Sequence, residues 1–261
     1  MIELLATLCL MAVALYTLRG GLIGPGRGLR VVGFDTSSIG LGVLAVGAAV
    51  WFFGWQFGAA LIITVVVHEF GHVVAFRVCG HSDARFRLIP LLGGVAISNK
   101  LPVSHEDDLF ISLMGPAICL APMVLCFALS ELVVEQFWGV ANFLYILGLV
   151  MGSLNFFNLL PLWPLDGGKI VQTLTYTYAP KATRIVSISM SATAAALCVL
   201  TGSFILLIFV LMSWPGLMQS EQLLRMKRPM TKTRALWATA AYLATLLAFG
   251  VGGSALLAGF F

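Results

Sequence analysis

The chain has 261 residues, of which 60% are hydrophobic and 10% charged, with a formal charge of +4 and a mean hydropathy of +1.00. A soluble globular domain carries about 25% charged residues, so this composition excludes one and predicts an all-α polytopic membrane protein. The positive charge lies in short loops, where lipid headgroups are sufficient to explain it, and we expect a lipid bilayer and no nucleic acid as partner.

Crossing the bilayer core takes about 20 consecutive apolar residues, and we expect six to eight transmembrane helices. The first apolar segment lacks a basic start and a small-residue cleavage site, which favours a retained helix over a signal peptide. The segment 185–213 is long for one crossing, and Thr201-Gly202-Ser203 predicts a tight hairpin within it. The expected spans are 3–18, 40–55, 57–79, 109–130, 138–160, 185–213 and 235–260.

Basic loop residues predict the orientation of the spans. Lys and Arg follow the first, third and fifth spans, so these loops are expected in the cytoplasm, whereas the loop with Glu131 and Glu135 is expected outside. The basic run 225–234 is cytoplasmic only if 185–219 crosses twice. Because no loop is long enough for a soluble domain, residues 1–261 are predicted to form a single transmembrane domain. We expect this domain in a bacterial inner membrane.

The third span contains the sequence His68-Glu69-Phe70-Gly71-His72. Residues four apart on a helix share one face, so both imidazoles can bind one Zn²⁺ while Glu69 handles the proton of a water. Ionisable side chains inside a membrane are expensive, which favours a functional role. Catalytic zinc usually takes three protein ligands, so a third is expected elsewhere.

Few side chains are available as the third ligand. His105 lies in "VSHEDD", where Ser104 and Asp107 have the spacing of a helix N-cap box, so we expect His105 to be solvated. His81, in the loop after the motif helix, remains an alternative ligand, and Cys79 is a weaker one.

Asp166 is the favoured candidate. It lies in "NFFNLLPLWPLDGGK" (155–169), where prolines and glycines interrupt an apolar helix. Irregular backbone at membrane depth is tolerated only where it is buried in protein or lines a wet cavity. An aspartate at such a break is well placed to complete a metal site, and the alternative is an ordinary Asp-Gly turn at a helix end.

At these two motifs the chain resembles the site-2 proteases, the zinc metalloproteases that cut inside membranes. The likeness covers roughly 58–169, which is the expected catalytic core between flanking helices in 1–57 and 170–261. Cys119 departs from the family, which often has Asn at that place. The residues that carry the resemblance are His68-Glu69-x-x-His72, Asn158-x-x-Pro161 with Leu165-Asp166-Gly167, "LIPLLGGVAI" (88–97) and "SLMGP" (112–116).

The resemblance implies that His68, His72 and Asp166 bind one zinc ion and that Glu69 is the catalytic base. It also implies that Asn158 holds the substrate backbone or the developing oxyanion. The implied activity is hydrolysis of peptide bonds in or near transmembrane segments of single-span, membrane-tethered clients, at an active site open to the cytoplasm. A regulatory membrane partner is compatible with this activity.

The segment 84–98 has short strand-like runs around Pro90 and Gly93-Gly94. It predicts a small membrane-associated β-hairpin after the motif helix, whose edge pairs with an opened substrate; the alternative is a plain connecting turn. Gly93 and Gly94 are therefore expected at the substrate. Since the substrate helix must open, Gly, Pro or Asn near the cut should favour cleavage.

Three other functions fit the sequence less well. Membrane metalloproteases that process prenylated proteins need a later glutamate ligand, but Glu131, Glu135 and Glu221 lie in predicted loops. An ion transporter usually has paired halves, and no internal repeat is visible. A pseudo-enzyme that only binds its client is disfavoured because all four chemical positions are present.

Overall fold

The computed structural model describes residues 2–22, 47–48, 50–52, 54–89 and 93–258. Most of the predicted span 40–55 lies outside these residues. Among them, six helical segments are long and apolar enough to cross a membrane, which confirms the predicted all-α membrane fold. These segments are Glu3–Leu22, Trp55–Val78, His105–Val133, Trp138–Asn158, Pro180–Leu200 and Lys232–Gly252.

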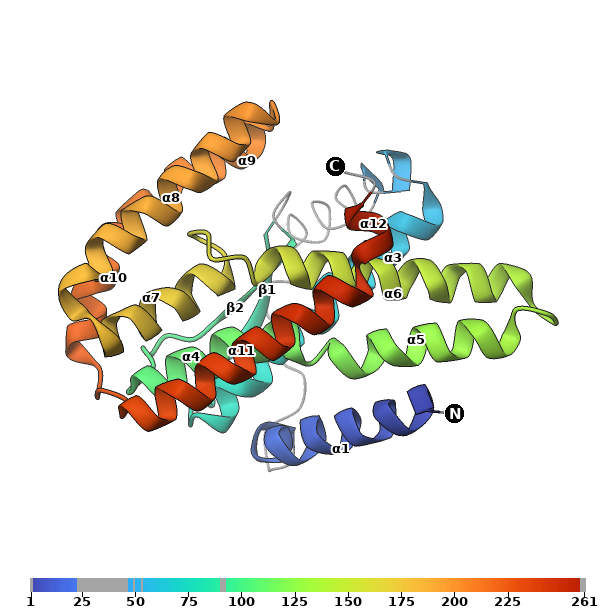
Figure 1. Ribbon diagram of the computed structural model, residues 1–261, viewed down its shortest axis with the longest axis horizontal. Helices are drawn as coiled ribbons and strands as arrows, with labels where there is room; N and C mark the ends of the chain where they lie inside the picture. The colour runs from blue at the N-terminus through green and yellow to red at the C-terminus, as the bar shows by residue number, and fades with distance from the viewer. Residues whose placement is uncertain (1, 23–46, 49, 53, 90–92, 259–261) are drawn as a thin grey trace. The chain divides into compact units, whose positions relative to one another are not determined.

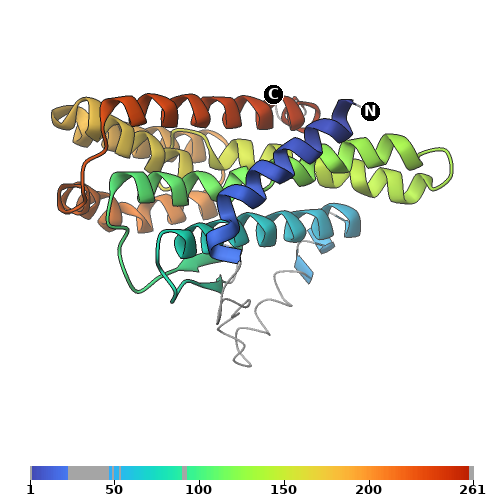
Figure 2. The same cartoon turned by 90° about the horizontal axis from the view of Figure 1, so that it is seen from below.

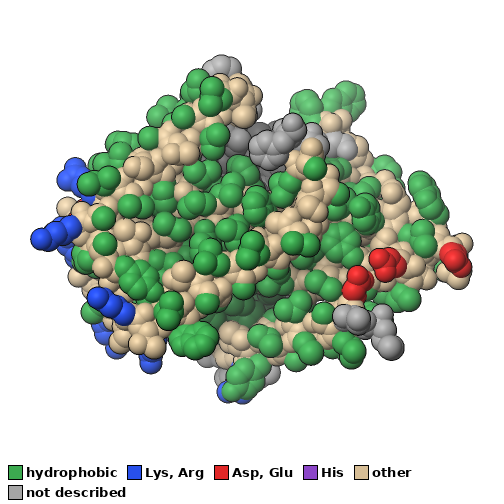
Figure 3. All heavy atoms as spheres, viewed as in Figure 1, with side chains coloured by type: hydrophobic (Ala, Val, Ile, Leu, Met, Phe, Trp, Pro, Cys, Tyr) green, Lys and Arg blue, Asp and Glu red, His purple; other side chains and the backbone are tan. Residues whose placement is uncertain are grey.

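Large apolar side chains on the surface agree with a membrane environment. Helix α11 (Lys232–Gly252) exposes Leu236, Trp237 and Val251 by more than 60% of their area. Figure 3 shows apolar side chains over most of the face in view. In water such a surface would be an aggregation hazard, whereas in a lipid bilayer the acyl chains would cover it. The protein is therefore an integral membrane protein.

The chain divides into two compact units, which are described separately. The first unit comprises Met1–Leu101, Met114–Phe156 and Leu247–Phe261, and the second comprises Pro102–Leu113 and Phe157–Leu246.

In the first unit, α1 (Ile2–Leu22) packs against α3 (Trp55–Val78) and α5 (Leu120–Val133). Helix α6 (Trp138–Asn158) contributes all but its last two residues. The four-residue α12 (Ser254–Leu257) lies beyond the end of α11.

The predicted β-hairpin forms in the first unit. Strands β1 (Arg85–Ile89) and β2 (Gly93–Ile97) pair antiparallel with Arg85 opposite Ile97, and both pack against α3 (Figure 1). The open end is fastened by Asp83, which accepts hydrogen bonds from the Asn99 N–H (2.6 Å) and the Ser98 hydroxyl (3.1 Å). The hairpin is thereby attached beside the motif helix.

In the second unit, α8 (Thr183–Leu200) packs against α7 (Asp166–Tyr178), α9 (Phe204–Met212) and α10 (Trp214–Met226), as Figure 2 shows from a second side. A short 3-10 helix, η1 (Pro180–Ala182), joins α7 to α8. The chain reverses at Thr201–Ser203, where Gly202 has φ +68°. This is the predicted hairpin, with α8 and α9 in place of one long span.

Helix α4 (His105–Ala117) begins in the second unit at the predicted N-cap box. The Ser104 hydroxyl accepts the Asp107 N–H (3.1 Å), and the Asp107 carboxylate accepts the Ser104 N–H (3.2 Å). The chain just before α4 pairs with the segment after α10: an isolated β-bridge joins Ser104 to Arg228, and Arg228 donates its N–H to the Val103 carbonyl. Two ion pairs, Lys227–Asp108 and Arg234–Glu106, strengthen this junction.

Candidate functional site

Helix α3 brings the two motif histidines together. Both side chains are buried, and their Nε2 atoms lie 3.1 Å apart with the rings edge to face. Two imidazole nitrogens bound to one tetrahedral zinc at 2.0–2.1 Å each would lie about 3.3 Å apart. The spacing of four residues therefore produces a pair of nitrogens that fits one metal ion.

Asn155, on α6, fixes the orientation of His68 and was not anticipated from the sequence. His68 Nδ1–H donates to the Asn155 side-chain oxygen at 2.7 Å, and the Asn155 amide nitrogen donates to the Met151 carbonyl at 2.8 Å. The second bond determines which end of the amide faces His68. With its proton on Nδ1, His68 keeps the lone pair of Nε2 for a metal, which is the usual role of an outer-shell partner.

Gly115, in the last turn of α4, makes room for His72. A methyl group on this glycine would collide with the His72 ring. The sequence resemblance at "SLMGP" thus has a physical basis, since only glycine lets the backbone lie against the imidazole.

Glu69 faces the β-hairpin in the first unit. Its carboxylate accepts a hydrogen bond of 2.9 Å from the Ala96 N–H of β2. Ala96 lies opposite Phe86 in the ladder, and successive residues of an antiparallel strand alternate between partner and outer edge. The outer edge of β2 therefore lies beside the predicted base.

Asp166 begins α7 in the second unit, directly after the helix break. Its side chain is buried and forms an ion pair of 3.1 Å with Lys169, one turn further along. The break itself is held by other residues, because Tyr242 donates to the Leu159 carbonyl (2.6 Å) and Trp163 to the Ser213 carbonyl (3.4 Å). The peptide bond Trp163–Pro164 is cis.

The two glycines after Asp166 allow the turn to close tightly. A methyl group on Gly167 would meet the carbonyls of Leu159 and Leu160, and one on Gly168 would meet that of Leu162. The sequence "DGG" is therefore required by backbone packing, and it holds Asp166 at the first turn of α7.

The residues predicted to bind the substrate lie at the end of α6 and in β2. Asn158 is the last residue of α6, half-buried, and its amide has no hydrogen bond within the described residues. Gly93 and Gly94 lie in β2, opposite Ile89 and Leu88.

Two other histidines have structural partners. His105 was expected in solvent, but it is 1% exposed, and its Nε2 donates to the Leu224 carbonyl at 2.9 Å. That prediction was wrong because the junction with α10 covers the start of α4. His81 is also buried, with Nδ1 2.9 Å from the Ser98 hydroxyl, so it belongs to the fastened end of the hairpin.

His68 and His72 in the first unit and Asp166 in the second are each buried, and each carries an atom that can bind a metal ion. Two imidazoles and a carboxylate match the nitrogen and oxygen ligands of catalytic zinc.

The chain is similar to several known proteins. The model of the family described as Peptidase family M50 matches residues 134–200. The chain is 33% identical over 118 residues to a zinc metalloprotease of Methanocaldococcus jannaschii, covering 44% of this chain and 32% of that protein. It is 28% identical over 154 residues to stage IV sporulation protein FB of Bacillus subtilis, covering 58% and 50%.

The chain thus spans half or less of the length of these two curated relatives. Among solved structures, a site-2 protease from Methanocaldococcus jannaschii matches with a TM-score of 0.45 and 23% identity, over 71% of this chain and 88% of that one. The family match includes the Asp166 motif, and the His68–His72 motif precedes it in the order seen in site-2 proteases. By the family match and the two curated relatives, the chain is similar to peptidase family M50, in agreement with the resemblance of its paired motifs to the site-2 proteases.

Proposed function

We propose that this protein is an intramembrane zinc endopeptidase, which hydrolyses peptide bonds in or near the transmembrane segments of membrane-tethered clients. One observation carries the proposal. Two buried imidazole nitrogens lie 3.1 Å apart, with a glutamate next to one of them, on a helix long and apolar enough to cross a membrane. Polar groups of this kind have no structural reason to lie there.

The zinc ligands in this proposal are His68, His72 and Asp166. The choice rests on the burial of all three, on their donor chemistry and on the hydrogen bond by which Asn155 orients His68 through Nδ1. A bound zinc ion would polarise the scissile carbonyl and lower the pKa of a water toward neutrality.

Glu69 acts as the general base. It takes a proton from the attacking water as the new C–O bond forms, and it returns the proton to the leaving nitrogen as the C–N bond breaks. The Asn158 amide, whose donors have no partner within the described residues, stabilises the developing oxyanion.

The substrate binds as an added strand on β2, at Gly93 and Gly94. The proposal is supported by the outer edge of β2, whose Ala96 N–H already donates to Glu69. A substrate strand that takes over such edge amides would lie next to the base and would have its own backbone opened for attack. Helix-weakening residues near the cut should then favour cleavage, and replacing them with Leu should slow it; unchanged cleavage would contradict strand addition.

The clients of the protein are single-span membrane proteins, and its active site opens toward the cytoplasm of a bacterial inner membrane. The cytoplasmic assignment is supported by the basic loop residues that follow the motif helix and α7. A regulatory membrane partner is compatible with this function.

Zinc content and cleavage of a panel of single-span substrates, measured on the same preparations, test the proposal. The wild type should hold about one zinc ion per chain, as expected for a three-ligand site, and Asp166→Ala should lose both metal and activity. Asp108→Ala removes a carboxylate that pairs with Lys227 and should keep both. If Asp166→Ala retained zinc and cleavage, the third ligand would lie elsewhere and the proposal would fail.

A further inference from the structure

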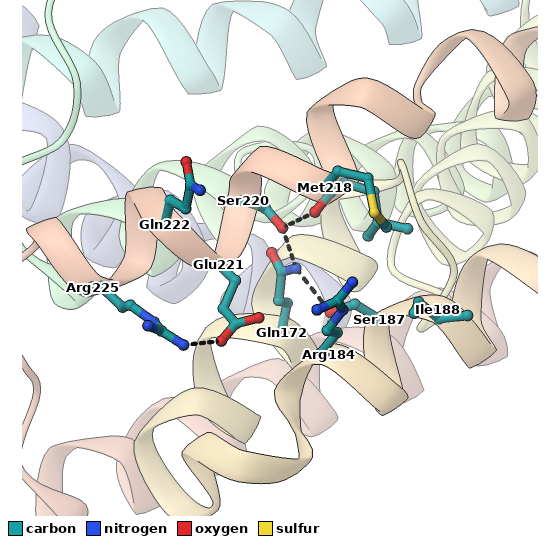
Figure 4. Close-up of a pocket in the computed structure, with 10 residues that line it drawn as sticks. Gln172, Arg184, Ser187, Ile188, Met218, Ser220, Glu221, Gln222 and Arg225 are labelled. Carbon is teal, nitrogen blue, oxygen red and sulfur yellow. Dashed lines mark hydrogen bonds and ion pairs between the residues drawn. The ribbon is translucent and has the colours of Figure 1, made fainter.

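A pocket of about 330 Å³ lies within the second unit, between α7, α8 and α10 (Figure 4). None of its lining residues belongs to the two metalloprotease motifs, and the proposed function leaves it without a role. Its lining consists of a polar floor, a basic rim and an apolar end.

The floor is a hydrogen-bonded platform. Gln172 of α7 is buried, and its amide nitrogen donates to Ser187 of α8 (2.8 Å) and to Ser220 of α10 (2.6 Å). The Ser220 hydroxyl in turn donates to the Leu217 carbonyl at 2.6 Å. One side chain thus joins three helices, so the pocket is built in advance of any ligand.

Two arginines form the rim. Arg225 donates to the Glu221 carboxylate at 2.6 Å, with 67% of its side chain still exposed. Arg184 is exposed and has no ion pair within the described residues, and Figure 4 shows it beside Gln172 and Ser187. Since a single glutamate faces two arginines, the rim retains positive charge.

The depth of the pocket follows from α8, which belongs to a candidate membrane span, Pro180–Leu200. Arg184 lies in its first turn, at the level where headgroups meet the span. At 1.5 Å per residue, Ile188 lies about 6 Å further into the apolar layer. Ile188, Leu217 and Met218 supply the apolar part of the lining.

We propose that this pocket binds the phosphate of an anionic phospholipid, with Arg184 and Arg225 on the phosphate and an acyl chain starting along Ile188 and Met218. Guanidinium groups match phosphate oxygens with paired hydrogen bonds. Basic pockets between membrane helices recognise anionic headgroups in this way. A zwitterionic headgroup would bring its own cation to a rim that already has excess positive charge, so it should bind less well.

Thermal unfolding of the purified full chain in detergent micelles tests the proposal without using proteolysis. Micelles are doped with increasing phosphatidylglycerol or phosphatidylcholine, or inorganic phosphate is added. Phosphatidylglycerol should raise the unfolding midpoint saturably, and phosphatidylcholine should not. In Arg184→Gln/Arg225→Gln, half-saturation should require roughly 100-fold more phosphatidylglycerol, because two charge-assisted contacts are lost.

The matched control is Arg228→Gln/Lys232→Gln, which removes the same charge from two exposed residues outside the pocket. It should bind phosphatidylglycerol within about fivefold of the wild type, since screened surface charges contribute little. Arg184→Gln alone breaks no ion pair, so it tests the pocket even if the double variant fails to fold, and it should weaken binding about tenfold.

Equal stabilisation by the two lipids, or an equal loss in the pocket and control variants, would overturn the proposal. If millimolar inorganic phosphate reproduced the shift with the same dependence on Arg184, the ligand would be free phosphate and the lipid assignment would be wrong.

Discussion

The helix that carries His68 and His72 and the broken segment that carries Asp166 position their polar groups in different ways. On α3 the helical repeat places the two imidazole rings on one face, and Asn155 and Gly115 of neighbouring helices contact those rings. The position of Asp166 does not come from a helical repeat. Its position depends on a tight turn in which Gly167 and Gly168 lie against backbone carbonyls.

This difference separates two kinds of sensitivity. A substitution in a residue that packs against His68 or His72 should change how that histidine is oriented, while α3 stays folded. In the turn before α7 the backbone itself holds Asp166 in place, so a substitution there should disturb both the fold and the position of Asp166. The following substitutions test this distinction.

Glu69→Gln should have the largest effect, because it removes the base without removing a proposed ligand. Cleavage should fall by roughly 10²–10⁴-fold, the usual contribution of a general base, while zinc content stays at the wild-type value. Single-turnover cleavage and elemental analysis measure both. Glu131→Gln, at an exposed glutamate in the last turn of α5, is the control and should change neither. Substantial activity in Glu69→Gln would rule out its role as base.

Asn155→Ala tests whether the neighbours of α3 act on the ligand alone. Loss of an outer-shell partner typically lowers metal affinity or activity by about 10–100-fold, because His68 can then rotate and exchange its tautomer. Competition with a zinc chelator measures the affinity. Asn142→Ala, on the same helix but bonded to Gln56, should leave zinc affinity unchanged. An equal loss in both variants would mean that α6 packing, not His68 orientation, is responsible.

The features predicted correctly from the sequence are those that local patterns determine. The apolar spans within the described residues, the hairpin at 85–97, the N-cap box at Ser104 and the reversal at Thr201–Ser203 each depend on residues close in the chain. His105 was misjudged because its partner, Leu224, is 119 residues away. Asn155 was missed although a signal existed, since an amide inside an apolar helix must find a partner.

Gly167→Ala and Gly115→Ala compare the two kinds of support directly. In Gly167→Ala the new methyl group meets backbone carbonyls that cannot move away, so overpacking should destabilise the protein by about 1–3 kcal/mol. In Gly115→Ala the methyl group meets the His72 ring, which can rotate, so zinc affinity should fall with a smaller loss of stability. Denaturant unfolding and chelator competition distinguish the two results.

Gly139→Ala is the control for both, because a methyl group there meets nothing within 4 Å. It should leave stability and zinc affinity near their wild-type values. If Gly115→Ala destabilised the protein as much as Gly167→Ala, the proposed difference between helix and turn would not hold.

The smallest effect is expected at Asp83, where the end of the hairpin beside Glu69 is held by a half-buried carboxylate rather than by apolar packing. The hydrogen bond from the Asn99 N–H, assisted by Ser98, lowers the pKa of Asp83 below its ordinary value. A carboxyl with a lowered folded-state pKa stabilises the structure above its unfolded pKa of about 3.9 and loses this effect as pH falls through the folded value. Hydrogen exchange should therefore show the Asn99 amide protected at pH 5 and less protected near pH 3. Asp83→Asn should remove this pH dependence, whereas Asp108→Asn, which lies in the second unit, should keep it. If protection of the Asn99 amide fell between pH 5 and pH 3 in Asp83→Asn as much as in the wild type, another group would control the end of the hairpin.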